Sequence, residues 1–171
     1  MGNALFSTNL NPSRRNYCEV KMNFKISQVE QITIKELNTK EEMLLAYPIL
    51  RQRYQDMSLE KYSEQISEMI EMNDFKMIGA FLGEEILGVA GYWVLSMLYC
   101  GRYIQVSSFI VDGEKRGAGI GRKILAEIDE IGKKLNCEKV ILDSFTENKK
   151  SHPLYYREGF YIRGFHFMKD L

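Results

Sequence analysis

A glycine-rich segment at 114–125, EKRGAGIGRKIL, has the residue types of an anion-binding loop. Glycine lets the main chain approach a ligand closely, and the first N–H groups of a helix point at an anion with the positive end of the helix dipole behind them. Basic side chains add positive charge at Lys115, Arg116, Arg122 and Lys123. This combination favours a phosphate or pyrophosphate ligand. Taken alone, the segment is also compatible with a turn that merely begins a helix.

Two common phosphate-binding motifs do not fit the segment. A Walker A loop ends in Gly-Lys-Ser/Thr, whereas Gly121 is followed by Arg122 and Lys123. A dinucleotide-binding fingerprint has the spacing GxGxxG within repeated βαβ units, whereas this loop reads GxGxG and the N-terminal half of the chain has no such repeat. The sequence therefore argues against both of these nucleotide-binding classes.

The loop is expected between a strand and a helix of an α/β domain. Ahead of it, the hydrophobic pattern predicts a strand at 31–37, a helix at 40–54 in which Pro48 is a candidate kink, and a second helix at 58–72. Three strands are then predicted at 75–82, 86–98 and 102–112. Behind it, the pattern predicts a helix at 120–136, a buried strand at 138–145, a short helix at 148–157 and a last strand at 160–168. Asn38 and Thr39 stand where the N-cap of the first helix is expected.

The bulk composition is that of a globular protein. The 171 residues include 23 basic and 23 acidic side chains, so the formal net charge of zero gives no reason to expect a nucleic-acid partner. No apolar run has the length of a membrane span. Three widely spaced cysteines and two histidines predict neither disulfides nor a metal site, and they favour a reducing cytoplasm. We expect residues 1–22 to be a loose extension and 23–171 to be one domain.

Two motifs in the right order resemble those of the GCN5-related N-acetyltransferases (GNAT). RGAGIG at 116–121 is similar to the family signature Arg/Gln-x-x-Gly-x-Gly/Ala, and NKKSHPLYYREGF at 148–160 is similar to its later Asn-x-x-Ala-x-x-x-Tyr and Gly-Phe segment, with Ser151 in place of Ala. The resemblance covers about residues 30–168 and includes the order of the elements. It implies the GNAT acyl-CoA N-acyltransferase fold, in which helices flank a mixed, mostly antiparallel sheet.

The resemblance also implies acetyl-CoA as co-substrate, with no metal, and it indicates which residues hold it. The main chain of the central strand would pair with the pantetheine arm at Phe109, Ile110 and Val111, as an open strand edge pairs with an extended ligand. Arg116 would assist the N–H groups that hold the pyrophosphate, those of Gly117, Ala118, Gly119, Ile120, Gly121 and Arg122. Asn148 would orient the later segment near the cofactor, or serve only as an N-cap.

Transfer of an acetyl group to an amine needs a proton donor for the leaving thiolate. Tyr155 matches the family's tyrosine for this task, and its phenol has an ordinary pKa of about 10. Tyr156 is the natural control, because adjacent residues of a helix point about 100° apart. The implied function is an acyl-CoA-dependent N-acyltransferase of class EC 2.3.1. A non-catalytic acyl-CoA-binding sensor or partner module is the alternative.

The proton acceptor and the acceptor substrate are less clearly encoded. Gln105 stands where several family members carry a glutamate base, so Asp143, His152 and a chain of water molecules stay open as proton acceptors. By the resemblance, the acceptor pocket would lie between two flanks, one with Arg51, Arg53, Tyr54 and Asp56 and the other with Tyr161, Phe165 and Phe167. Small-molecule and peptide amines both fit this pattern, as do a monomer and a homodimer.

Overall fold

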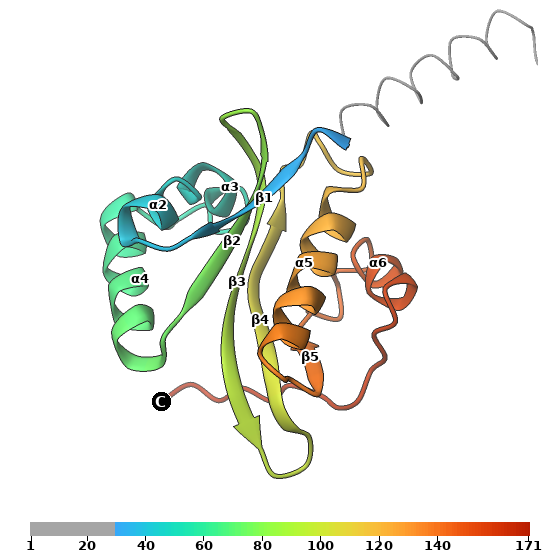
Figure 1. Ribbon diagram of the computed structural model, residues 1–171. Coiled ribbons are helices and arrows are strands. Elements are labelled where there is room, and N and C mark those ends of the chain that lie inside the picture. The colour runs from blue at the N-terminus through green and yellow to red at the C-terminus, as the bar shows by residue number, and fades with distance from the viewer. Residues whose placement is uncertain (1–29) are drawn as a thin grey trace, which may run out of the picture.

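The computed structural model describes residues 30–171, so the extension predicted at 1–22 lies outside the described residues. Figure 1 shows a twisted sheet between two helical layers. The five strands are β1 (Thr33–Leu37), β2 (Lys76–Leu82), β3 (Glu85–Met97), β4 (Gly101–Val111) and β5 (Lys139–Leu142). The helices are α2 (Lys40–Leu44), α3 (Tyr47–Arg51), α4 (Leu59–Asn73), α5 (Ile120–Lys134) and α6 (His152–Arg157).

The sheet is mixed and mostly antiparallel, which confirms the predicted fold class. Its strands lie in the order β1-β2-β3-β4-β5, and the first three pairings are antiparallel. β4 and β5 run parallel, and α5 crosses between them. Figure 1 shows α2, α3 and α4 on one face of the sheet and α5 on the other.

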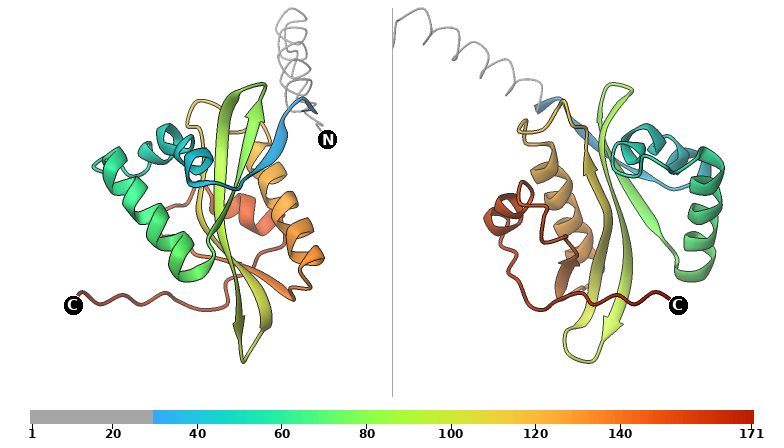
Figure 2. Two further views of the ribbon diagram at one scale, coloured as in Figure 1. Left: turned by 60° about the vertical axis from the view of Figure 1, so that its left-hand side comes forward. Right: turned by 180° about the vertical axis from the view of Figure 1, so that it is seen from behind.

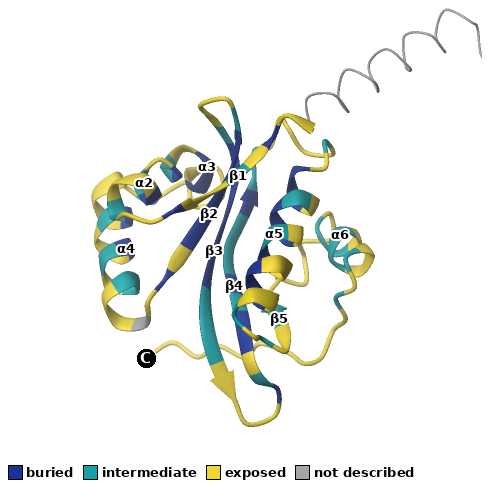
Figure 3. Ribbon diagram, in the orientation of Figure 1, coloured by how far each residue is buried: buried dark blue, intermediate teal, exposed yellow. Residues whose placement is uncertain are grey.

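Each face of the sheet has its own apolar cluster. The α5 face buries Ile124, Leu125 and Ile128 completely or nearly so, as the 3.6-residue pattern of this helix predicts. The opposite face packs Phe75 and Met77 against residues of α2, α3 and α4. Figure 3 shows buried residues along β2, in the first half of β3 and at separate positions of β4. The central strands are therefore covered on both sides and fix the positions of everything attached to them.

The helix predicted at 40–54 is divided into α2 and α3. Thr39 begins α2 with a capping box, in which its hydroxyl accepts from the N–H of Glu42 and the Glu42 carboxylate accepts from the N–H of Thr39. Pro48 lies in the first turn of α3, where its missing N–H costs no helical hydrogen bond. The predicted kink is therefore a break, because proline cannot donate to the preceding turn. The helix predicted at 58–72 is α4, and Ser58 is its N-cap, with a hydroxyl that accepts from the N–H of Lys61.

The strand predicted at 160–168 is wrong. β5 pairs only with β4, and no segment after α6 joins the sheet of the described residues. The side chains of Tyr161, Phe165 and Phe167 are 68%, 81% and 90% exposed. Figure 2 shows this segment running past the sheet as an extended chain. Alternating aromatic residues predict a strand, but a strand forms only where a neighbour's N–H and C=O groups are available.

Within residues 30–171, no helix has the length and apolar character that a membrane span requires.

Gly91 of β3 lies against the ring of Phe75, so close that an added Cβ would collide with the ring. We expect Gly91→Ala to lower the free energy of unfolding by about 1–3 kcal/mol, because the buried ring must move to accommodate the methyl group. Urea denaturation followed by circular dichroism measures this change. Gly164→Ala is the control, since no heavy atom lies within 4 Å of the added Cβ. Equal stabilities of the two variants would contradict the packing described for Gly91.

Candidate active site

The edge of β4 that faces β5 is open over its last five residues. β5 pairs with β4 only from Tyr103 to Val106, whereas β4 continues to Val111. On its other side this part of β4 is still held by β3, with Ser107 opposite Gly91 and Ile110 opposite Val89. Residues 107–111 therefore have main-chain groups on one edge that no strand of the described chain pairs with. This is the edge where the sequence places the pantetheine partners Phe109, Ile110 and Val111.

A β-bulge at Ser108 changes which side chains of β4 face each layer. Two residues of β4 oppose the single residue Ala90 of β3, and Ser108 has a positive φ of 49°. Ahead of the bulge, Ile104 and Val106 belong to the cluster under α5, and beyond it Phe109 packs against the same cluster. The bulge thus directs Phe109 toward α5 although the regular alternation would turn it away.

The glycine-rich loop ends at an uncapped helix. Gly117 and Gly119 have φ values of 80° and 82°, a left-handed conformation that side chains disfavour. Gly119 is the N-cap of α5, no side chain caps the helix there, and its first turn contains no acidic residue. The first N–H groups of α5 are therefore free of a competing carboxylate. This arrangement meets the requirements of an anion site, as the sequence predicted for residues 117–122.

Among the four basic side chains of the loop, Arg116 is the one without a partner in the described chain. The three others already have partners: Lys115 with Glu85 at 3.7 Å, Arg122 with Glu158 at 3.6 Å, and Lys123 with the carbonyl oxygen of Ile32 at 3.1 Å. Arg116 is exposed and forms no ion pair with any residue of the described chain. Its guanidinium can therefore bind a phosphate without first giving up a carboxylate.

Helix α6 is packed tightly against the start of α5. A Cβ on Gly121 would lie 3.1 Å from Cδ2 of Leu154 and 3.3 Å from Cζ of Phe109, so the missing side chain allows three elements to meet. Next to this contact, the ring centroid of Tyr155 lies 6.2 Å from that of Phe109 and 6.1 Å from that of Phe160. Tyr155 is thereby fixed beside the open edge of β4.

The surroundings of Tyr155 keep its phenol protonated. Burial raises the pKa of Tyr155 above its ordinary value, and hydrogen bonding with Ser151 and Ser144 partly offsets this effect. At neutral pH the phenol is therefore a proton donor. Tyr156 points elsewhere and is 55% exposed. The structure thus separates the two adjacent tyrosines as helical geometry predicts.

Asn148 does not cap α6. The helix begins later than predicted, at His152, and its N-cap residue is Ser151. The Ser151 hydroxyl donates to Oδ1 of Asn148 at 3.1 Å, and the N–H of Ser151 donates to the Asn148 carbonyl at 3.0 Å. Asn148 therefore organises the turn that leads into α6, and its simple N-cap alternative is wrong.

The predicted proton acceptors are engaged in contacts of their own. Nε2 of Gln105 donates to Oδ2 of Asp143 at 3.2 Å, and Nδ1 of His166 lies 3.5 Å from the other carboxylate oxygen. Nε2 of His152 lies 3.1 Å from the carbonyl oxygen of Phe145, and it must donate there because a carbonyl only accepts. Asp143 is therefore held beside Gln105, whereas His152 is directed toward the main chain.

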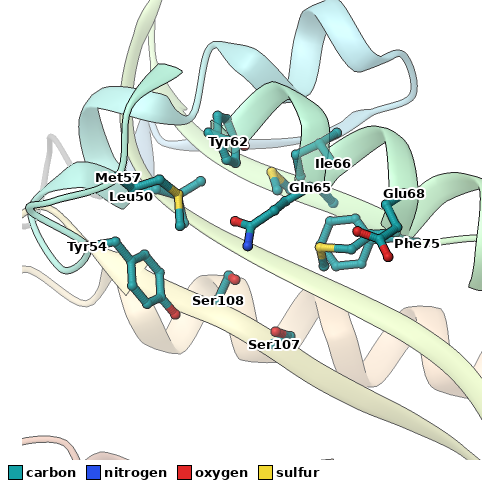
Figure 4. A pocket seen from close by; sticks show the side chains of 12 residues that line it. Leu50, Tyr54, Met57, Tyr62, Gln65, Ile66, Glu68, Phe75, Ser107 and Ser108 are labelled. Carbon is teal, nitrogen blue, oxygen red and sulfur yellow. The ribbon is translucent and has the colours of Figure 1, made fainter. Parts of the chain in front are cut away.

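A pocket of about 350 Å³ lies between α4 and β4 (Figure 4). Half of its lining residues are apolar: Leu50, Met57, Ile66, Met69, Phe75 and Met77. The other half are polar: Tyr54, Tyr62, Gln65, Glu68, Ser107 and Ser108. Its size is that of a site for one small molecule.

The residues predicted to flank an acceptor pocket lie only in part at this pocket. Tyr54 lines it, while Arg53 and Asp56 border a neighbouring hollow and Arg51 borders neither. Tyr161, Phe165 and Phe167 line neither hollow. Sequence reasoning missed Gln65 and Glu68 of α4, although the helical spacing places them beside the recognised apolar positions Tyr62, Ile66 and Met69.

Hydrogen bonds hold the wall of the pocket in place. The Tyr62 hydroxyl donates to the Met43 carbonyl at 2.7 Å and ties α4 to α2, and the Tyr47 hydroxyl donates to the Met57 carbonyl at 2.8 Å. The Gln52 side chain accepts from the N–H of Gly113 at 2.9 Å, which links the end of α3 to the loop after β4. The helical layer that forms one wall of the pocket is therefore joined to the chain that follows β4.

Ser107, Ser108 and Phe109 connect the two halves of the site. The two serines line the pocket, and the next residue, Phe109, contacts Tyr155 on the side of α5. Within three residues, β4 therefore passes from a pocket of small-molecule size to the half-buried side chain of Tyr155.

Comparison with known proteins agrees with this arrangement. The sequence profile described as the Acetyltransferase (GNAT) family matches residues 42–160. The uncharacterized N-acetyltransferase YhdJ of Bacillus subtilis (strain 168) is 22% identical over 82% of this chain and 99% of that protein. The glucosamine 6-phosphate N-acetyltransferase of Trypanosoma brucei brucei is 40% identical over 55 residues, 32% of this chain and 35% of that protein.

A solved structure with the same fold contains coenzyme A. It is the aminoglycoside N-acetyltransferase AAC(6')-Iy in complex with CoA, with a TM-score of 0.68, 16% identity, and coverage of 82% of this chain and 95% of that one. Since the family profile spans more than half of the sequence, the chain belongs to the GNAT family of acetyltransferases. It is an acyl-CoA-dependent N-acyltransferase.

The bulge at Ser108 can be tested by substitution, with the same substitution at Ser107 as the control. Ser108 has a positive φ, which a β-branched side chain disfavours strongly, whereas Ser107 is not among the residues with positive φ. We expect Ser108→Val to lower the free energy of unfolding by about 1–2 kcal/mol more than Ser107→Val. Thermal and urea denaturation of the two variants measure the difference. A smaller loss for Ser108→Val than for Ser107→Val would mean that the bulge is not at residue 108.

Proposed function

We propose that this enzyme transfers the acetyl group of acetyl-CoA to a primary amine by direct attack, with Tyr155 as the general acid. The observation that carries the proposal is the position of Tyr155, half-buried and protonated, beside the unpaired edge of β4. An extended thioester ligand would occupy that edge, and an amine in the pocket behind Ser107 and Ser108 would approach the same place from the other face.

The residues present fit acetyl-CoA. Its pyrophosphate needs N–H donors and positive charge, which the start of α5 and the unpaired Arg116 offer. Its amide-bearing arm needs unpaired main-chain groups, which Phe109, Ile110 and Val111 offer on the edge that β5 leaves open. These three residues, Arg116, the N–H groups of 117–122 and Asn148 form our proposed cofactor site.

The chemistry requires the acceptor to lose a proton to water before attack, because an ammonium group has no lone pair, and it requires two further proton movements. The lone pair of the amine attacks the thioester carbonyl carbon, and the C–S bond breaks when the tetrahedral intermediate collapses. The leaving thiolate takes the phenolic proton of Tyr155, which is in place at neutral pH, and the phenolate regains a proton from solvent before the next turnover. The attacking nitrogen loses its extra proton to water in the pocket, since Gln105, Ser107 and Ser108 cannot act as bases at neutral pH.

The activity and the acid are tested together with acetyl-CoA, an amine panel and a thiol reagent that detects released CoA. We expect steady release from the unaltered protein. In Tyr155→Phe we expect kcat to fall about 10²–10⁴-fold, because the thiolate then leaves without a positioned donor. Tyr156→Phe is the matched control and should retain kcat, since its side chain points away from β4.

Full activity of Tyr155→Phe would rule out this tyrosine as the acid. Tight binding of acetyl-CoA without CoA release for any amine would instead favour the alternative, a non-catalytic acyl-CoA-binding module. The two results can be told apart, because the first excludes Tyr155 as the acid but leaves an active enzyme, whereas the second shows that the protein has no turnover.

The loop is tested by cofactor binding. Gly119→Asp introduces a negative charge and a side chain at a residue with φ of 82°, so the affinity for acetyl-CoA should fall at least about tenfold. Arg116→Ala should weaken binding by about three- to tenfold through loss of an exposed cation–phosphate contact. Isothermal titration calorimetry measures both. Arg102→Ala, an exposed arginine at the opposite end of β4, should bind like the unaltered protein. Equal affinities of all variants would exclude the loop as the pyrophosphate site.

A further inference from the structure

We propose that the acceptor is a primary amine with a single positive charge on an apolar body, and that Glu68 is the carboxylate that attracts it. This inference rests on the proposed function, because it assigns the pocket between α4 and β4 to the acceptor. The pocket supplies three independent observations: the nature of its walls, its charge and the contrast with the neighbouring hollow.

The walls favour an apolar body. Three of the six apolar lining residues are methionines, Met57, Met69 and Met77, whose flexible thioethers adapt to a ligand's shape. Phe75 lies behind these side chains and is 2% exposed, so it makes the wall apolar without presenting its ring face to the pocket. A sugar placed here would press hydroxyl groups against these side chains and lose their hydrogen bonds to water. A hydrocarbon or aromatic group would instead gain free energy by leaving water and contacting these apolar side chains.

The charge of the pocket favours one ammonium group. Glu68 is the single carboxylate among the lining residues, and lysine, arginine and histidine are absent from that lining. Glu68 forms no ion pair with any other residue between 30 and 171, so its charge is available to a ligand. A polycation would need several carboxylates, and its remaining charges would lie against apolar walls.

The polar groups of the pocket are divided between its two sides. Figure 4 shows Glu68 beside Phe75 on the α4 side, with Gln65 directed into the pocket toward Ser108. Ser107 and Ser108 mark the β4 side, where the acetyl group would be presented. Gln65 and Glu68 stand three residues apart on α4, so both reach the same ligand from one helical face.

The neighbouring hollow provides the contrast. It is bordered by Arg53, Asp56 and Lys61, which together favour an anion, and it shares Tyr54 and Met57 with the pocket. A phosphorylated amino sugar would need these cations. The guanidinium of Arg53 already lies over the ring of Phe145, 5.2 Å from its centroid. We therefore assign recognition to Glu68 and the apolar walls.

The substrate class is tested by turnover on four amines with acetyl-CoA. We expect 2-phenylethylamine to give a kcat/KM at least about tenfold higher than spermidine, kanamycin or glucosamine 6-phosphate. A higher value for any of these three would overturn the inference while leaving the proposed function intact.

The role of Glu68 is tested by Glu68→Gln, which removes the charge and retains the shape. We expect KM for 2-phenylethylamine to rise about tenfold, the effect of losing one charge-assisted hydrogen bond, with KM for acetyl-CoA unchanged. Glu64→Gln is the matched control, an exposed glutamate of α4 that does not line the pocket. Identical KM values for the two variants would overturn the assignment of Glu68.

Binding can also be measured without turnover. Trp93 is the only tryptophan in the sequence, and its ring centroid lies 5.0 Å from that of Phe75 in the pocket wall. We expect 2-phenylethylamine to change Trp93 fluorescence in a saturable manner, with a weaker affinity in Glu68→Gln. This result without CoA release would support the amine site and count against the proposed function. No saturable change, together with no turnover of 2-phenylethylamine, would overturn the inference.

Discussion

The active site depends on the short parallel pairing between β4 and β5. This pairing ends at Val106 and Leu142, and beyond it β4 continues alone toward the glycine-rich loop. A longer ladder would have consumed the main-chain groups that an extended ligand needs. Because β5 ends early, the chain also turns away in time to place α6 and Tyr155 beside Phe109. The early end of this pairing therefore leaves the edge of β4 open and also allows Tyr155 to lie beside it.

Much of this arrangement is predictable from the sequence, because its strongest signals are local. The period of α5, the capping residues Thr39 and Ser58, and the glycines ahead of α5 act within a few residues of where they stand. The order of the two motifs then indicates the fold. The exposed C-terminal segment shows where prediction from local pattern fails. Residues 160–168 alternate like a strand, but alternation describes the faces of a segment and does not provide a partner for its edges.

The functional details that sequence reasoning missed depend on tertiary context. Serine at position 108 does not by itself predict a positive φ. The positive φ of Ser108 accompanies the β-bulge through which β4 pairs with β3. Gln65 and Glu68 look like ordinary polar residues of an amphipathic helix. They become pocket residues only because α4 packs with its edge facing Ser107 and Ser108. Such residues are identified by what lies opposite them, which one sequence does not show.

Gly121 has a consequence for how the two halves of the site respond to perturbation. Its missing side chain lets Leu154 of α6 and Phe109 of β4 rest directly on the first turn of α5. The first turn of α5 and the helix that carries Tyr155 are therefore in direct contact. A shift of α5 would be transmitted to the phenol at once. How closely α6 approaches the start of α5 is thus set by a hydrogen atom of Gly121 in place of a methyl group.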